Sequence, residues 1–156
     1  MTHLRTVPSL RPFLFIIGLL FLIAAFSSCH RDALFGIKGT GPSLNETRNP
    51  GAFTGVEMNV DAQVILHTDS FYRVEITAQA NILEVLRTVV NGNILKVYFT
   101  DEVRTHKDIT IHIYAPTYQK LELAGSGSVS CSDSIHVTDF YTSVSGSGSL
   151  SFTAID

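Results

Sequence analysis

Few residues of this sequence are of a type, and in a setting, that could do chemistry, and Cys29 is the first of them. It ends the stretch "FSSC", and the chain has one other cysteine, Cys131. Small residues directly before a cysteine are typical of a bacterial lipobox. In a lipobox a diacylglyceryl group is attached to the cysteine sulfur, and cleavage leaves that cysteine at the new N-terminus. We therefore predict that Cys29 is lipidated.

The residues before Cys29 have the parts of an export signal. Arg5 and Arg11 form a positively charged start, and an uninterrupted apolar run extends from Phe13 to Phe26. A membrane-spanning helix needs roughly 17–25 residues, so this run is short for one. We predict that residues 1–28 are a cleaved signal peptide. An ordinary secretory signal with an incidental cysteine is the alternative, but two or more acyl chains would hold the protein firmly at a membrane.

Ser134 is a second candidate for covalent chemistry. It lies in "DSI" at residues 133–135. This triplet resembles the acceptor pattern for protein O-glycosylation in Bacteroidetes, in which Asp precedes Ser or Thr and an aliphatic residue follows. Ser134 is therefore a candidate O-glycosylation site.

No pattern of catalytic or metal-binding residues is present. The histidines lack the HExxH or HxH spacing of a metal site, and the Gly-Ser stretches lack the Lys-Ser/Thr of a phosphate loop. A GxSxG nucleophile elbow is also missing. We predict that the protein is not an enzyme and that it uses no metal and no cofactor. The formal net charge is −3 and the basic residues do not cluster, which excludes nucleic acid as a partner.

The elements that would position these residues follow a period of two. In "VEMNV", Val56, Met58 and Val60 lie on one face of an extended chain. Four further stretches alternate in the same way, which favours half-buried strands: "QVILHT", "YRVEIT", "ILKVYFT" and "DITIHIY". In "NILEVLRTVVNGN" the apolar spacing predicts one helical turn and then a strand. Asn91-Gly92 is a strong signal for a two-residue hairpin.

Two near copies of one pattern follow these strands. "LAGSGSVSCS" starts at Leu123, and "VSGSGSLSFT" starts 21 residues later at Val144. Flexible Gly-Ser linkers lack periodic apolar residues, whereas here apolar residues alternate on both sides of each Gly-Ser stretch. A fixed period of this length is typical of stacked coils. The repeat predicts that Leu123 pairs with Val144, and Cys131 with Phe152.

Each copy is therefore expected to form a strand, a Gly-Ser corner and a second strand. Glycine reaches positive φ without steric cost, and stacked corners leave no room for larger side chains. The predicted fold class is all-β, a right-handed β-solenoid or β-helix-like stack of short strands, with an antiparallel sandwich or hairpin array as the alternative. Residues 29–52 are expected to be a tether, and residues 53–156 the β domain. The structural corner residues are Gly125, Gly127, Gly146 and Gly148.

The chain resembles the head GIN domain family, the heads of auto-transporter adhesins, which is common in lipoproteins of the Bacteroidetes. The residues that carry the resemblance are "GIKGTG" at 36–41, "ETR" at 46–48, "FTGVEMNVDAQVILHTDS" at 53–70, "VVNGNILKVYF" at 89–99 and "LELAGSGSV" at 121–129. The family implies an all-β, β-solenoid-like fold, an extracytoplasmic location and no catalytic residues. Family members usually continue beyond two Gly-Ser units.

These observations together predict a non-catalytic, lipid-anchored protein of the cell envelope, on the periplasmic or the surface face of the outer membrane. We expect it to be an adhesin or a module that binds a glycan or a surface protein. The alternative is a structural or envelope-stress accessory lipoprotein without a small ligand. The second Gly-Ser unit is followed by nothing that resembles a polar cap. We therefore expect the β domain to be C-terminally incomplete.

Overall fold

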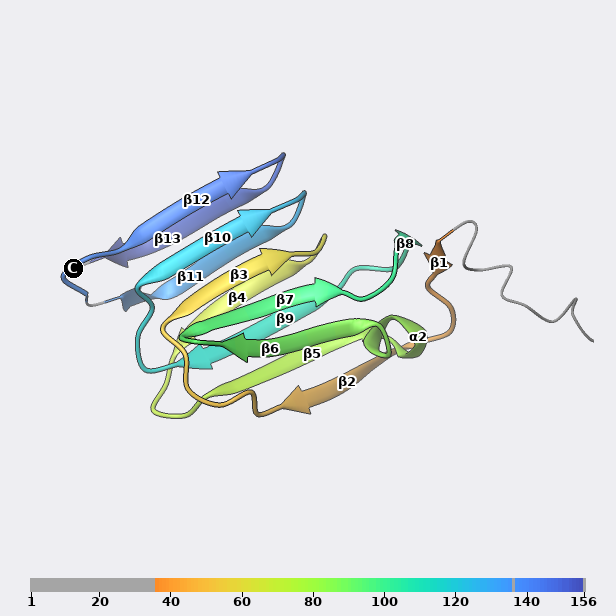
Figure 1. The fold of residues 1–156 in the computed structure, drawn as a ribbon, viewed down its shortest axis with the longest axis horizontal. Coiled ribbons are helices and arrows are strands. Elements are labelled where there is room, and N and C mark those ends of the chain that lie inside the picture. Colours follow the sequence, from red (N-terminus) through yellow and green to blue (C-terminus); the bar gives the residue numbers. More distant parts are fainter. Residues whose placement is uncertain (1–35, 136, 156) are drawn as a thin grey trace, which may run out of the picture. The chain divides into compact units, whose positions relative to one another are not determined.

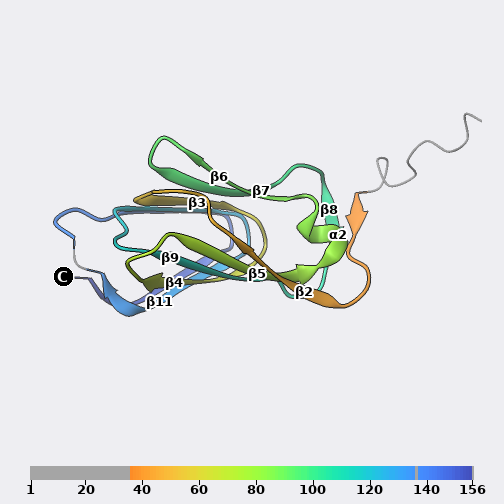
Figure 2. The same ribbon diagram turned by 90° about the horizontal axis from the view of Figure 1, so that it is seen from below.

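The alternating segments form two sheets that lie face to face, accompanied by a small third sheet (Figures 1 and 2). The computed structural model describes residues 36–135 and 137–155, so the predicted signal peptide and Cys29 lie outside the described residues. The five-stranded sheet has the order β12-β10-β3-β7-β6. Its strands are β3 (Gly55–Asn59), β6 (Leu86–Asn91), β7 (Ile94–Phe99), β10 (Lys120–Ala124) and β12 (Tyr141–Ser145).

The six-stranded sheet has the order β13-β11-β4-β9-β5-β2. Its strands are β2 (Ser43–Arg48), β4 (Gln63–Thr68), β5 (Arg73–Gln79), β9 (Thr110–Ala115), β11 (Ser128–Ile135) and β13 (Ser149–Ile155). The small sheet pairs β1 (Ile37–Lys38) with β8 (Val103–Thr105), and a four-residue helix, α2 (Ala80–Leu83), follows β5.

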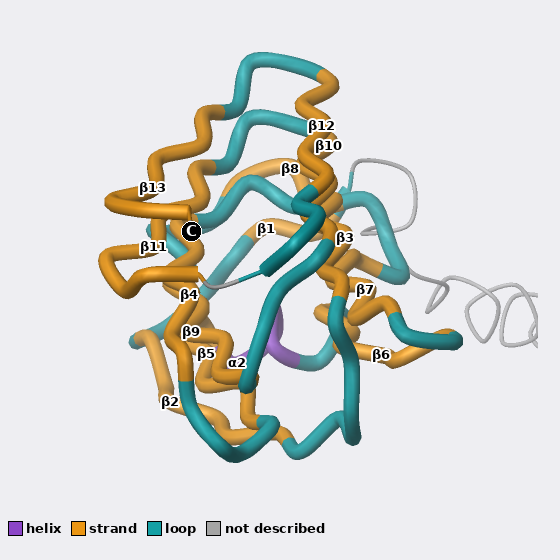
Figure 3. Tube along the Cα trace, turned by 90° about the vertical axis from the view of Figure 1, so that its left-hand side faces the viewer, coloured by secondary structure: helices purple, strands orange, loops and turns teal. Residues whose placement is uncertain are grey.

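Three segments each pass from one sheet to the other through a tight turn, and we call such a strand–turn–strand segment a rung. The rungs are β3–β4, β10–β11 and β12–β13, and they pair in parallel in both sheets. Figure 3 shows them stacked one above another. On the other side of β3–β4, the parallel strands β7 and β9 continue the stack. The rung that comes first in the sequence therefore lies inside the stack.

The register of the two Gly-Ser rungs confirms the 21-residue repeat. Leu123 pairs with Val144 in the five-stranded sheet, and Cys131 pairs with Phe152 in the six-stranded sheet. Because this pairing is parallel, the alternative of an antiparallel hairpin array is wrong for these two rungs. The apolar side chains of both rungs point between the sheets, as the period of two requires.

The other part of the fold departs from the predicted solenoid, because the sheets are mixed. β2, β5 and β6 pair antiparallel to their neighbours. The turn at Asn91-Gly92, with Gly92 at a φ of +61°, joins β6 and β7 as the hairpin that the sequence predicted. The single helical turn, α2, was also predicted, and it carries the chain from the six-stranded to the five-stranded sheet. The described residues thus form an all-β fold with mixed sheets rather than a closed solenoid.

The structure also differs from the prediction of a tether at residues 29–52. Part of this segment forms β2, which pairs with β5 along six residue pairs from Ser43↔Gln79 to Arg48↔Val74. The apolar alternation of other strands is absent from "SLNETR", and this concealed the strand. On the face that carries Leu44, Glu46 and Arg48, the leucine is half exposed, and Arg48 Nε lies 2.7 Å from a Glu46 carboxylate oxygen.

One apolar core fills the space between the two sheets. Val56, Met58, Val64 and Leu66 of the β3–β4 rung are fully buried. Burial of this kind contributes roughly 1.5–3 kcal/mol for each large side chain. Tyr118 is also fully buried, and its hydroxyl lies 2.8 Å from the Ile113 carbonyl oxygen and 2.9 Å from that of His67. Burial raises the pKa of the Tyr118 phenol above its ordinary value.

Candidate functional site

The residues singled out in the sequence lie at separate places in the fold. Ser134 is exposed on β11, next to an irregularity in the pairing of β11 with β13. Its neighbours are fixed, because an Asp133 carboxylate oxygen accepts a hydrogen bond of 2.9 Å from the Thr68 backbone N–H, and Ile135 is buried. Ser134 is thus an exposed hydroxyl on an ordered strand, and it shares no cluster with another predicted site residue.

The four Gly-Ser glycines lie in the turns of their rungs, for two different reasons. Gly125 and Gly146 have φ angles of +121° and +116°, which L-residues rarely adopt. Gly127 and Gly148 lie outside the positive-φ region, so close stacking is their constraint. A Cβ on Gly127 would lie 2.7 Å from the Ala62 carbonyl oxygen, and one on Gly148 would lie 2.7 Å from the Gly127 carbonyl oxygen.

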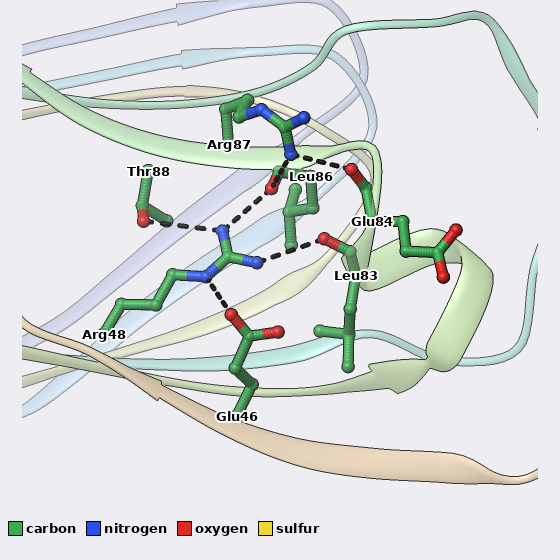
Figure 4. A network of polar contacts seen from close by, with 7 residues as sticks. All are labelled: Glu46, Arg48, Leu83, Glu84, Leu86, Arg87 and Thr88. Carbon is green, nitrogen blue, oxygen red and sulfur yellow. Dashed lines mark hydrogen bonds and ion pairs between the residues drawn. The ribbon is translucent and has the colours of Figure 1, made fainter.

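Arg48 forms the centre of a polar network between the free edges of the two sheets (Figure 4). Its guanidinium donates hydrogen bonds to the carbonyl oxygens of Leu86 and Leu83, at 2.8 and 3.1 Å, and its Nε lies 2.7 Å from a Glu46 carboxylate oxygen. Arg48 and Glu46 both line a surface depression of about 590 Å³. The guanidinium thus links β2 to α2 and β6. Because its hydrogen bonds go to groups of the protein itself, we interpret the network as structural.

A second cluster lies on the outer face of the six-stranded sheet, and it includes two of the histidines that lack the spacing of a metal site, His67 and His112. The ring centroids of His67 and Tyr114 are 4.6 Å apart, and the Arg73 guanidinium lies 4.1 Å above the Tyr114 ring. His67 Nε2 also lies 2.9 Å from His112 Nδ1. The histidine contacts follow from the parallel pairing of β4 with β9, and the Arg73–Tyr114 contact follows from the antiparallel pairing of β5 with β9; the sequence reveals neither. Tyr114 has both ring faces covered, so it offers no free aromatic face.

The outer face of the five-stranded sheet carries opposite charges in neighbouring positions. Lys96 lies 2.7 Å from Glu57, and Lys120 lies 3.1 Å from Glu122. The hydrogen bond and charge of Glu57 raise the pKa of Lys96 above its ordinary value. Exposed pairs of this kind contribute little to stability, so they chiefly keep the surface polar and the lysine side chains in place.

A third location combines an exposed aromatic ring with polar side chains whose hydrogen-bonding groups remain available. This depression of about 480 Å³, the Tyr141 pocket, lies beside the start of β10 and β12. Among the described residues, none of its Thr, Gln or Asp side chains makes a hydrogen bond within the protein, in contrast to the Arg48 network. The pocket is lined by Thr117, Gln119, Val137, Thr138, Asp139 and Tyr141.

In residues 36–135 and 137–155, no three His, Cys, Asp or Glu side chains are placed to hold a metal ion. The described part of the chain also contains no helix of sufficient length and hydropathy to span a membrane. Cys131 is a buried free thiol, and burial raises its pKa, which disfavours the reactive thiolate.

Stacked parallel rungs and mixed sheets define this chain as an all-β domain of two facing sheets. The family model described as "Putative auto-transporter adhesin, head GIN domain" matches residues 52–156, and the chain belongs to this family. No curated protein matches the chain.

Several solved structures share the fold. A putative adhesin from Bacteroides fragilis has a TM-score of 0.70 and 18% identity, and the match covers 77% of this chain and 57% of that one. A protein from Parabacteroides distasonis, described as a putative lipid binding protein, has a TM-score of 0.68 and 18% identity, with coverages of 76% and 53%. A putative adhesin from Parabacteroides merdae has a TM-score of 0.64 and 14% identity, with coverages of 69% and 46%. The chain thus spans about half the length of these proteins. At such identities the similarity shows the fold alone.

Proposed function

We propose that this protein is a non-catalytic binding module of the bacterial cell envelope that attaches to a glycan or a surface protein. The match of residues 52–156 to an adhesin head family carries the proposal, and it suggests a cell-envelope or surface location. The exposed polar side chains of the Tyr141 pocket support a binding role, because within the described residues they have no protein partner and are accessible to a ligand.

We further propose that the module is held at the outer membrane by a lipid on Cys29, after removal of residues 1–28. The apolar run and "FSSC" support this. Metabolic labelling with a fatty-acid probe should mark the wild-type chain and the control Cys131→Ser, but not Cys29→Ser. Equal labelling of Cys29→Ser would contradict the anchor, and protease shaving of intact cells would report which face of the membrane carries the domain.

The rungs β3–β4, β10–β11 and β12–β13 are, in this proposal, coils of a right-handed β-solenoid. Their parallel pairing in both sheets supports it. A crystal structure of the chain would test the hand of the coils.

Binding is tested with beads that carry the full chain, presented to immobilised glycans and to proteins from cell surfaces. Retention on at least one class of surface is the expected result, together with no turnover of polysaccharides or esters, with or without calcium. Beads that attach to neither class would contradict a binding function. Reproducible turnover lost on substitution of one outward carboxylate would contradict the non-catalytic assignment.

A further inference from the structure

The Tyr141 pocket is the place in the described structure where an exposed aromatic ring and available polar groups coincide. Tyr141 is 56% exposed. Gln119, Asp139 and the two threonines bring an amide, a carboxylate and two hydroxyls to the same depression. Its volume of about 480 Å³ lies within the roughly 300–1,000 Å³ typical of small-molecule sites.

Tyr141 contacts the neighbouring strand β10 and the residue before it. The Tyr141 backbone N–H donates a hydrogen bond of 2.9 Å to the Gln119 carbonyl oxygen, and Tyr141 pairs directly with Lys120 in the sheet. The Lys120 ammonium lies 5.7 Å from the ring centroid, within cation–π range. The same ammonium lies 3.1 Å from a Glu122 carboxylate oxygen in an exposed salt bridge. The sheet therefore fixes the backbone that carries the Tyr141 ring, and the Lys120 ammonium lies near the ring.

The loop before Tyr141, which also lines the pocket, is attached to the core. Val137 packs against the core, and Phe140 contacts Phe152 edge to face, with ring centroids 5.3 Å apart. Thr138 and Asp139 lie between these two anchors. The loop that carries Thr138 and Asp139 is thus attached to the core at both ends.

We propose that the Tyr141 pocket binds a pyranose sugar that carries no acidic group, as the glycan-recognition subsite of the binding module. The inference rests on the proposed function and names its ligand class. A pyranose ring presents axial C–H groups, which suit the face of a tyrosine, and rim hydroxyls, which donate to a carboxylate and both donate to and accept from an amide.

The charge of the pocket selects against acidic sugars. Asp139 brings a carboxylate into the pocket, and the nearby Lys120 ammonium is paired with Glu122. A uronic acid would place a second carboxylate beside Asp139, and like charges in a confined site repel each other. A neutral sugar meets no such repulsion.

The test uses the full chain in a detergent without a sugar head group. Chitobiose, lactose and mannobiose are the neutral probes, glucuronic acid is the acidic probe, and saturation-transfer NMR and chemical-shift titration report binding. We expect at least one neutral disaccharide to bind, and glucuronic acid to bind at least tenfold more weakly. Tyr141→Ala should weaken the neutral sugar at least tenfold, whereas Tyr141→Phe, which keeps the ring, should stay within threefold.

Phe71→Ala is the matched control, because Phe71 is an exposed aromatic residue, 69% exposed, that does not line the pocket. It should leave sugar binding unchanged. Asp139→Asn should reduce the discrimination against glucuronic acid. Neutral-sugar binding that survives Tyr141→Ala would overturn the pocket assignment and leave the binding module standing. If none of the three disaccharides bound while the beads were still retained on surface proteins, the pocket assignment would again be wrong and the binding module would stand. Beads that attach neither to glycans nor to surface proteins would overturn the binding module and the pocket assignment together.

Discussion

The two Gly-Ser rungs share one sequence pattern and differ in how well they are covered. In the β10–β11 rung, Leu123, Val129 and Cys131 are buried, whereas in the β12–β13 rung Val144 is 45% exposed and Phe152 is only partly buried. The difference follows from the position of each rung in the stack. Within the described residues, β10–β11 lies between two other rungs, whereas β12–β13 has a neighbouring rung on one side only. Burial in this fold is thus set by the neighbouring rung, and equivalent substitutions in the two rungs should have unequal effects.

The largest effect is expected from filling the stacked turns. The Cβ of Gly127→Val would lie 2.7 Å from the Ala62 carbonyl oxygen and 2.9 Å from that of Val60, and neither backbone atom can rotate away. We expect a loss of about 3 kcal/mol in the free energy of unfolding. Gly148→Val meets the Leu123 side chain and the Gly127 carbonyl oxygen, but the outer rung can shift outward, so a loss of about 1–2 kcal/mol is expected.

Denaturant unfolding followed by circular dichroism measures both turn variants. Gly92→Val serves as a reference, since a Cβ there meets no atom within 4 Å but Gly92 has a φ of +61°. The loss in Gly92→Val reports backbone strain without crowding, whereas the losses in Gly127→Val and Gly148→Val report crowding. An unchanged melting temperature for Gly127→Val would show that the turns are not stacked in solution.

A smaller difference is expected when the same side chain is truncated in the two rungs. Val129 is 1% exposed, so Val129→Ala leaves a cavity and should lower the free energy of unfolding by about 2 kcal/mol. Val144→Ala removes the same methyl groups from a half-exposed position, and we expect a loss below about 1 kcal/mol. Equal losses in thermal unfolding would mean that the outer rung is covered in solution.

How far the sequence could predict this fold depends on how local each signal is. The alternation of β3, the hairpin at Asn91-Gly92 and the 21-residue register all follow from residues close together in the chain, and the structure confirms them. The place of β3–β4 inside the stack was not predictable. Its turn holds Val60, Asp61 and Ala62 instead of a Gly-Ser copy, so no repeat marks it as a partner of β10–β11.

The same argument applies to the candidate site. Gln119 comes from the loop before β10, and Asp139 and Tyr141 come from the loop before β12 and from the start of that strand. The parallel pairing of β10 with β12 brings the two segments together. The row of Arg73, Tyr114 and His67 likewise depends on β9 lying between β4 and β5. No repeat fixes the register of β4, β9 and β5, so the sequence does not bring this row together. The 21-residue repeat does give the pairing of β10 with β12, but no motif marks the side chains around Tyr141 as a binding site.

The buried hydroxyl and thiol near the inner rung predict a loss of stability at alkaline pH. Burial raises the pKa of both the Cys131 thiol and the Tyr118 phenol. Unfolded Cys and Tyr ionise near pH 8.5 and 10, so above each pH the unfolded state releases a proton that the folded state keeps. The free energy of unfolding therefore keeps the full contribution of both groups below about pH 8. Above that pH it falls, by at most about 1.4 kcal/mol per pH unit for each group.

Unfolding titrations between pH 7 and 11 measure this effect, with Cys131→Val as the variant. It should remove the decline between about pH 8.5 and 10 and keep the part due to Tyr118 at higher pH. A pH profile identical to that of the wild type would show that the Cys131 thiol is not protected by the fold.

The smallest expected effect is weak self-association through the outer rung. Within the described residues, β12 and β13 each have a strand on one side only, so their other backbone N–H and C=O groups are unpaired. Open strand edges beside exposed apolar side chains favour pairing between chains.

We expect a soluble version that begins after residue 28 to associate at raised concentration. Val144→Lys should shift it toward the monomer, because a charge at that position opposes pairing. Phe71→Lys is the matched control, since Phe71 is 69% exposed but lies in the loop between β4 and β5, not on an edge strand. Sedimentation velocity over a range of concentrations measures all three proteins. A wild type that stays a monodisperse monomer and melts cooperatively would mean that the outer rung closes the stack without a neighbour, and the contrast between the two rungs would then be one of exposure alone.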